Sequence, residues 1–295
     1  MSRATWARLT ALCALALATT ACATLPQPTK VQDFGAAVST TAGIFREAVS
    51  ANRALAIRAN QESQAQAYIR RRPYTLTETG DYTAVLVKAD AQLAALAALE
   101  QYGKAITLAA DQGVVDKLEQ ASVRLGEAAG GLVIAASPVA IPVAGPALKL
   151  TSRGVGFLLG NAYAGEIQAV LVARNASVKK LAEELDLSLE ALGALLGAQL
   201  DQFEIERMAT LDVIRRDRRV DALRLDGAYR TARTDLEGAR ALLSSLAKYK
   251  AALRALTEAH DALAKGEGSS EVAVRRFVAL ANDLADVLKA VRAAQ

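Results

Sequence analysis

The sequence LLSSLAKYKAALRALTEAHDALAK, residues 242–265, decides the fold class. Its larger side chains recur alternately every four and three residues, which places them on one side of an α-helix. The spacing persists for about three heptads, as in the seam of a coiled coil. The stretch therefore predicts a long helix that is buried along one side. The seam residues are Leu242, Leu246, Tyr249, Leu253, Leu256, His260 and Leu263.

The same spacing occurs near both ends of the chain. Towards the start it links Phe34, Val38, Thr41, Phe45, Ala48, Asn52, Leu55 and Ala59, and near the end it links Phe277, Ala281, Leu284, Leu288 and Val291. Alanine and leucine dominate the composition, aromatic residues make up only 4%, and there are six prolines. This balance favours helix over strand. We expect an all-α protein, an elongated helical bundle of long, partly coiled-coil helices.

Prolines, glycines and capping residues predict where these helices end. We expect helices over about 33–71, 82–111 and 177–265, ended by Pro73, Gly113 and Gly266, with a shorter helix through Leu118 and Leu125. An interruption is expected near Gly227, and Ser269 or Ser270 can cap a final helix. Residues 33–295 are thus predicted to form a single helical domain.

The N-terminus has the pattern of an export signal. Arg3 and Arg8 precede an apolar run, Leu9–Leu17, which is too short to span a bilayer. The residues that follow, Ala18-Thr19-Thr20-Ala21-Cys22, resemble the lipobox of bacterial lipoprotein precursors. The resemblance implies a signal peptide over 1–21 and lipidation of Cys22. Alternatively, Ala21-Cys22-Ala23 is an A-x-A cleavage signal of a secreted protein.

The residues after Cys22 indicate where the protein would be held. Ala23 resembles the residue at this position in lipoproteins that are sent to the outer membrane. We expect a lipid-anchored protein on the periplasmic face of the outer membrane of the cell envelope, or else a secreted or soluble periplasmic one. Residues 22–32, with Pro26 and Pro28, are predicted to form an extended tether.

An apolar segment over residues 128–165 interrupts the helical pattern. It carries no charge up to Leu148, and Pro138, Pro142 and Pro146 exclude a regular helix there. The segment either folds back against the long helices or contacts a membrane or a partner. This layout resembles that of α-helical pore-forming toxins of the cytolysin A type. The candidate contact residues are Leu132, Val133, Ile134, Val139, Ile141, Val143, Phe157 and Leu158.

Few residues suggest catalysis. His260 is the only histidine, whereas metal sites and acid–base schemes usually need several such groups. Its place in the seam favours a polar residue that sets helix register. The glycines from Gly154 to Gly160 have the wrong spacing for a dinucleotide loop, and Cys13 lies in the predicted signal peptide. We expect no enzyme activity, no catalytic residue, no metal and no cofactor.

Two basic runs stand out in a chain of formal net charge +4, namely Arg70–Arg72 and Arg215–Arg219. Elsewhere the charges of both signs are interspersed, which disfavours nucleic acid as a partner. Each run is a solvated helix face or terminus, or a contact for anionic lipid headgroups or acidic envelope polymers. The sequence predicts a helical structural or interaction module that binds an envelope protein or itself. The alternative is a membrane-inserting protein of pore-forming type that uses residues 128–165.

Overall fold

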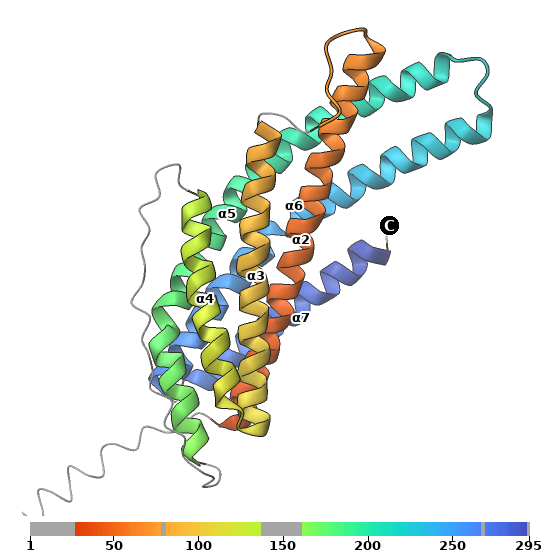
Figure 1. Ribbon diagram of the computed structural model, residues 1–295. Coiled ribbons are helices and arrows are strands. Elements are labelled where there is room, and N and C mark those ends of the chain that lie inside the picture. The colour runs from red at the N-terminus through yellow and green to blue at the C-terminus, as the bar shows by residue number, and fades with distance from the viewer. Residues whose placement is uncertain (1–26, 78–80, 137–160, 267–268, 294–295) are drawn as a thin grey trace, which may run out of the picture.

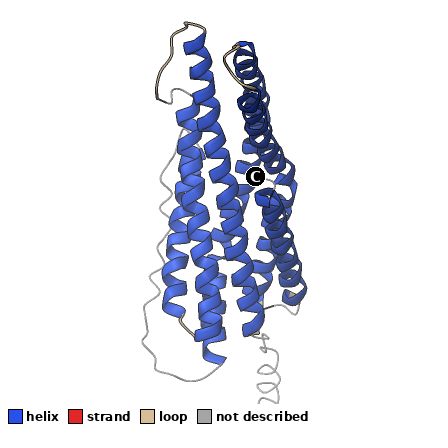
Figure 2. Ribbon diagram, turned by 90° about the vertical axis from the view of Figure 1, so that its right-hand side faces the viewer, coloured by secondary structure: helices blue, strands red, loops and turns tan. Residues whose placement is uncertain are grey.

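The computed structural model describes residues 27–77, 81–136, 161–266 and 269–293. Within these ranges the chain forms helices joined by short turns and contains no strand (Figure 1; Figure 2). This confirms the prediction of an all-α, elongated bundle. The helices are α2 Pro28–Ile69, α3 Asp81–Gln112, α4 Val115–Ala136, α5 Asn161–Arg216, α6 Ala222–Lys265 and α7 Ser270–Ala293.

The helices run up and down the long axis of the molecule. α2 packs against α3, α3 against α4, α5 against α6 and α6 against α7, each pair antiparallel (Figure 1). We call the end where α2 begins the proximal end, and the end where α2 finishes and α5 turns into α6 the distal end. Both of these turns lie at the top in Figure 1 and Figure 2. The α5–α6 hairpin diverges from α2 there and projects to the side (Figure 1).

One apolar cluster at the proximal side draws residues from all six described helices. At its centre Phe34 of α2, Tyr102 of α3 and Phe277 of α7 are completely enclosed. Most of the predicted α6 seam lies in this cluster, from Tyr249 to Leu263. Leu246 is half-buried, and the Leu242 side chain lies outside the described part of the chain. The seam therefore faces a shared core that several helices build together.

Two glycines bring α2 and α3 into backbone contact. A Cβ on Gly103 would lie 2.5 Å from the Ser39 nitrogen, and a Cβ on Gly35 would lie 2.7 Å from the Gly103 oxygen. Neither neighbouring group is a side chain that could move aside. Only glycine fits at both positions, so α2 and α3 form the closest pair in the bundle. A Cβ on Gly193 of α5 would meet a side chain instead, because it would lie 2.8 Å from the Leu246 Cδ1 of α6.

The predicted tether is too long at its C-terminal side. Residues 28–32 form the first turn of α2 and are not extended. Pro28 occupies the first helical position, where its missing N–H would have had no helical partner. Val31 is buried and Lys30 pairs with Glu271 of α7 at 2.8 Å, so this turn belongs to the bundle.

The break in the C-terminal half also differs from the prediction. The chain turns at residues 217–221, and Gly227 lies inside α6. The Asp217 side chain accepts the Arg219 N–H at 3.0 Å, and Asp221 caps α6 by accepting the Arg224 N–H at 2.8 Å. Aspartate caps end and start the helices here, whereas one glycine inside a long packed helix costs only about 1 kcal/mol. α5 also begins earlier than expected, at Asn161.

The predicted apolar segment is only partly described. α4 continues to Ala136, two residues before Pro138, which agrees with the bias of residues that precede proline away from helix. Leu132, Val133 and Ile134 lie in the last turns of α4, and nothing is described of their side chains. Val139, Ile141, Val143, Phe157 and Leu158 lie outside the described residues, as does Cys22. The membrane-inserting alternative therefore stays a prediction.

Candidate functional site

The turn after α2 exposes large apolar side chains beside three arginines. We call residues 68–77 the α2 tip. Tyr68, Ile69, Tyr74 and Leu76 are all exposed there, and Leu76 is 94% accessible. The two tyrosine rings meet edge to face, with centroids 5.0 Å apart. Arg70–Arg72 adjoin them, and the sequence from Ser63 to Thr77 contains no acidic residue. The tip is therefore both basic and apolar.

The end of α2 holds one arginine in an unusual backbone conformation. The Arg72 N–H donates to the Ala67 carbonyl at 2.9 Å, and the Arg71 N–H donates to the Tyr68 carbonyl at 3.0 Å. These two bonds define a Schellman motif, in which the residue after the cap is left-handed and is usually glycine. Here that residue is Arg71, with φ of 58°. The left-handed conformation strains a residue that has a Cβ.

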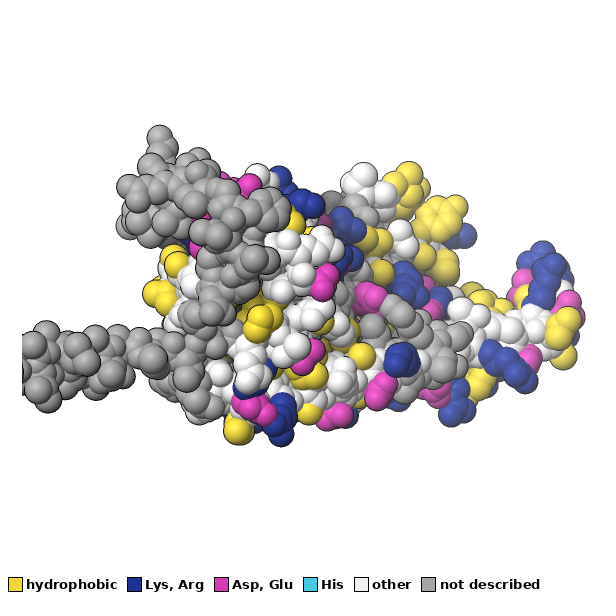
Figure 3. All heavy atoms as spheres, turned by 90° about the horizontal axis from the view of Figure 1, so that it is seen from below, with side chains coloured by type: hydrophobic (Ala, Val, Ile, Leu, Met, Phe, Trp, Pro, Cys, Tyr) yellow, Lys and Arg dark blue, Asp and Glu magenta, His cyan; other side chains and the backbone are white. Residues whose placement is uncertain are grey.

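The turn from α5 to α6 repeats this composition. We call residues 213–224 the hairpin tip. Leu223 is 81% exposed and Val213 is also exposed. Arg215, Arg219 and Arg224 pair with nearby aspartates, whereas Arg216 and Arg218 make no ion pair with any described residue. Figure 3 shows dark-blue side chains gathered at the projecting right-hand end of the molecule, where this hairpin ends.

A polar cluster ties α2 to α5 and α6 just before the two tips. Arg207 of α5 donates to Glu62 of α2 at 3.1 Å and to Asp235 of α6 at 3.0 Å. Arg58 of α2 reaches the same Asp235 at 2.7 Å. The Gln66 amide donates to the Thr210 hydroxyl at 2.6 Å. The last of these contacts joins Gln66 to Thr210. Gln66 lies three residues before Ile69 and Thr210 three residues before Val213, so the two tips begin at nearly the same level along the long axis of the bundle.

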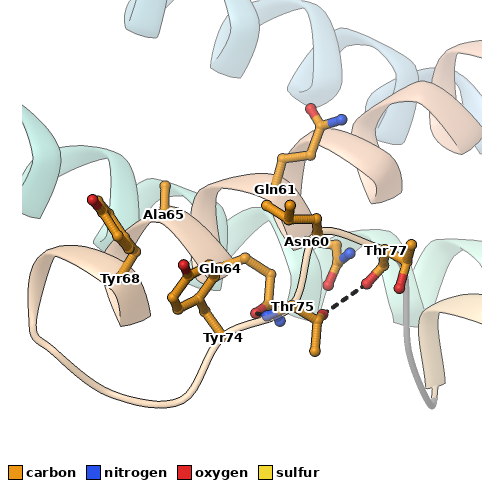
Figure 4. A pocket seen from close by; sticks show the side chains of 9 residues that line it. Asn60, Gln61, Gln64, Ala65, Tyr68, Tyr74, Thr75 and Thr77 are labelled. Atoms are coloured by element: carbon orange, nitrogen blue, oxygen red, sulfur yellow. Dashed lines mark hydrogen bonds between the residues drawn. The ribbon is translucent and has the colours of Figure 1, made fainter.

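An open pocket of about 460 Å³ lies between the end of α2 and the α2 tip. Figure 4 shows the tip folded back under α2, where the Thr75 N–H donates to the Gln64 amide oxygen at 2.8 Å. The Thr75 hydroxyl donates to the Thr77 carbonyl at 2.8 Å. Amides, hydroxyls and the rings of Tyr68 and Tyr74 line the pocket. The residues that line it include no histidine, cysteine, aspartate or glutamate, so the pocket offers hydrogen bonds and aromatic surface.

His260 lies in the opposite, proximal part, where all its hydrogen-bonding groups are used. Tyr102 Oη lies 2.9 Å from Nε2, and Asn175 Oδ1 lies 3.0 Å from Nδ1. Burial raises the pKa of Tyr102 well above its ordinary value, so its hydroxyl stays protonated and donates to Nε2. Nδ1 then donates to Asn175, whose Nδ2 donates to Asp261 at 2.7 Å. The neutral imidazole thus completes a chain across α3, α6 and α5.

The surroundings of His260 favour this neutral form. Burial lowers its pKa from 6.5 to about 4, and the nearby Asp261 carboxylate opposes that shift only partly. The Lys265 and Asn175 hydrogen bonds keep the pKa of Asp261 below its usual value. The imidazole has no surface exposure and no free nitrogen. Its geometry matches the predicted role of a buried polar residue that fixes how the helices align.

No protein-family model, no curated protein and no solved structure matches this chain. Among the helices in the described ranges, none combines the length and apolar character needed to cross a bilayer. The same ranges hold no group of three or more histidine, cysteine, aspartate or glutamate side chains placed to bind a metal ion.

The structure brings together residues that the sequence kept far apart. The two predicted basic runs lie at the same end of the molecule, although more than 140 positions separate them in the chain. The exposed apolar residues beside them were missed in the sequence. Ile69 and Leu223 are adjacent to arginines and Leu76 lies four positions after Arg72, which was the available signal. The Arg207 cluster had no such signal, because its members come from three helices.

Proposed function

We propose that this chain is a non-enzymatic cell-envelope lipoprotein, anchored by lipid on Cys22, whose bundle presents an interaction surface at its distal end. The observation that carries the proposal is the placement of the tips. α2 begins close after the predicted anchor and ends in the α2 tip. With 42 residues at ~1.5 Å each, it separates the two by roughly 60 Å.

Other features support an interaction module over an enzyme. The only histidine is enclosed, and both of its ring nitrogens are engaged. The distal end exposes apolar and cationic side chains together, which is typical of surfaces that bind a partner. The long helices give this surface a rigid support, because their apolar faces share one core.

Mass spectrometry of the protein purified from membranes tests the proposal. The expected N-terminal residue is an acylated Cys22, and a Cys22→Ser variant should leave the membrane fraction. A product that keeps residues 1–21 and fractionates with the cytosol would overturn the proposal. Size-exclusion chromatography with light scattering of the purified protein then tells self-association from a module that needs another partner.

A further inference from the structure

We propose that the distal end docks on the surface of an anionic lipid bilayer, so that the chain joins the membrane that holds its lipid to a second membrane. The anchor in this inference rests on the proposed function, whereas the docking depends only on the two tips. Both tips lie at the end opposite Pro28, the first residue of α2 (Figure 1). A surface bound there would lie away from the anchoring membrane.

The α2 tip combines the kinds of side chain that a lipid interface takes up. Leu76 lies in the part of the tip that folds back beside Gln64, and at 94% exposure it offers apolar surface for the acyl region. Tyr68 and Tyr74 are exposed beside it, and tyrosine prefers the level of the headgroups. Arg70–Arg72 have no side-chain partner among the described residues. Their guanidinium groups are therefore free to bind lipid phosphates.

The hairpin tip supplies a second contact of the same kind. Leu223 is exposed in the first turn of α6, Tyr229 is exposed further along the same helix, and Arg216 and Arg218 are unpaired in the described part of the chain. The Arg207 cluster ties α5 and α6 to α2 below the two tips. Because both tips belong to one bundle, a surface bound by the first raises the effective concentration for the second.

The apolar residues favour a bilayer over an acidic polymer. Arginines alone suffice to bind a polyanion, and its charged chain would leave Leu76 and Leu223 in water. A bilayer surface removes both side chains from water while its phosphates neutralise the arginines. The composition of both tips therefore fits lipid better than it fits any soluble polyanion.

Arg71 adds an independent sign that the tip serves binding. Its position in the Schellman motif is one that glycine occupies without strain, yet the chain has arginine there with φ of 58°. The motif ends α2 and turns the chain sharply within the run of three arginines. An Arg71→Gly variant separates the two roles of this residue. It should unfold less readily and bind the surface more weakly.

A vesicle-bridging experiment tests the inference. The acylated full-length protein is placed in neutral phosphatidylcholine vesicles, and acceptor vesicles of phosphatidylcholine with phosphatidylglycerol are added. Bridging is measured by light scattering and by whether a dye enclosed in the acceptor vesicles floats together with the donor vesicles. We expect bridging with these anionic acceptors, none with purely neutral acceptors, and marked weakening in high salt. Protein that enters the donor vesicles without bridging would overturn the docking, whereas failure to enter them would overturn the anchor.

Substitutions at the α2 tip should weaken the binding of acceptor vesicles by different factors. Arg70→Gln, Arg71→Gln and Arg72→Gln together should weaken acceptor binding roughly 100-fold, at ~1 kcal/mol per arginine. Leu76→Ser should weaken it about tenfold. The matched control changes three exposed lysines away from both tips to glutamine, namely Lys117, Lys180 and Lys248. The control variant removes the same amount of positive charge as the arginine variant. If it weakens binding equally, the effect depends only on net charge and the inference is wrong.

Two further results distinguish lipid from polymer. If a purified anionic polysaccharide binds the protein and anionic vesicles do not, the distal end is a polymer site and the inference is wrong. If Leu76→Ser leaves vesicle binding unchanged while the arginine variant abolishes it, the Leu76 side chain does not contribute to binding and the assignment to lipid is wrong. Circular dichroism of each variant shows whether it keeps the helical fold, so lost binding is assigned to the surface only in folded protein.

Discussion

The proximal and distal parts of the bundle are held together in different ways. In the proximal part all six described helices contribute to one apolar cluster. The distal part has a separate, small cluster of Leu55, Ala59, Leu200 and Phe203, next to the ion pairs of Arg207. Partly exposed ion pairs contribute little to the free energy of unfolding. We infer that the distal part opens at lower free energy than the proximal part.

The largest expected effect comes from emptying the proximal core. Phe277 is fully enclosed, with its ring centroid 5.6 Å from that of Phe34. A Phe277→Ala variant should lose about 3–5 kcal/mol of unfolding free energy, measured by urea denaturation. Phe203→Ala is the distal counterpart. If hydrogen exchange shows Phe203→Ala opening the whole bundle and not mainly residues 200–236, the two parts are one cooperative unit and the comparison is wrong.

A pH effect of nearly that size should arise at His260. The unfolded chain binds a proton on this residue below pH 6.5, but the folded chain does so only below about pH 4. Stability is therefore fully present above pH 6.5 and falls as the pH drops towards 4, by about 3 kcal/mol. Carboxylates titrate in the same window, so the readout is the difference between the native chain and His260→Gln. Parallel stability curves for the two proteins would contradict the assigned burial.

The glycine contact between α2 and α3 should give a smaller effect with an internal control. Gly103→Ala places a Cβ against the backbone of Ser39 and Gly35, and should cost about 1–3 kcal/mol. Nothing lies within 4 Å of a Cβ on Gly43, which is in the same helix pair. Gly43→Ala should therefore stabilise the protein by up to ~1 kcal/mol. Equal effects of the two changes in thermal denaturation would rule out the close approach.

The smallest effect is expected in the distal ion pairs. Asp235→Asn leaves Arg58 and Arg207 with a neutral partner and should cost about 1 kcal/mol, less in high salt. Faster hydrogen exchange should be confined to the end of α5 and the start of α6. Glu237→Gln is the control, because its pair with Arg233 is exposed within one helix and should contribute less than the contacts of Asp235. A larger loss for Glu237→Gln would contradict the role of the Arg207 cluster.

The sequence predicts the helices well because their signals are local. The four-and-three spacing identified the buried side of α6, and Pro73, Gly113 and Gly266 ended helices as expected; Gly113 and Gly266 have positive φ. Three boundaries were wrong, and two of them have reasons that are also local. Pro28 was taken as part of a tether although it starts α2, and the break was expected near Gly227 although the chain turns at residues 217–221. Capping by side chains outweighed one glycine in a packed helix. The third is the start of α5, which lies at Asn161 and not near residue 177.

The distal surface could be predicted only in parts. Both arginine runs were visible, and contact with anionic lipid was one of their two interpretations. What the sequence could not supply is their proximity, because it depends on how α2 packs against α5 and α6. The exposure of Leu76 and Leu223 is equally a tertiary property. The local sequence around an isolated leucine beside a charged turn is the same whether or not a neighbouring helix covers that leucine.

The continuity of α2 has a mechanical consequence. Its first turn is tied to α7 through Lys30 and Glu271, and its last turn carries the α2 tip. At roughly 60 Å, a helix that tilts by about 10° at its base swings its far end by roughly 10 Å. A small tilt at the base therefore moves the tip over a wide range, and a force applied to the tip is transmitted along α2 to the anchor.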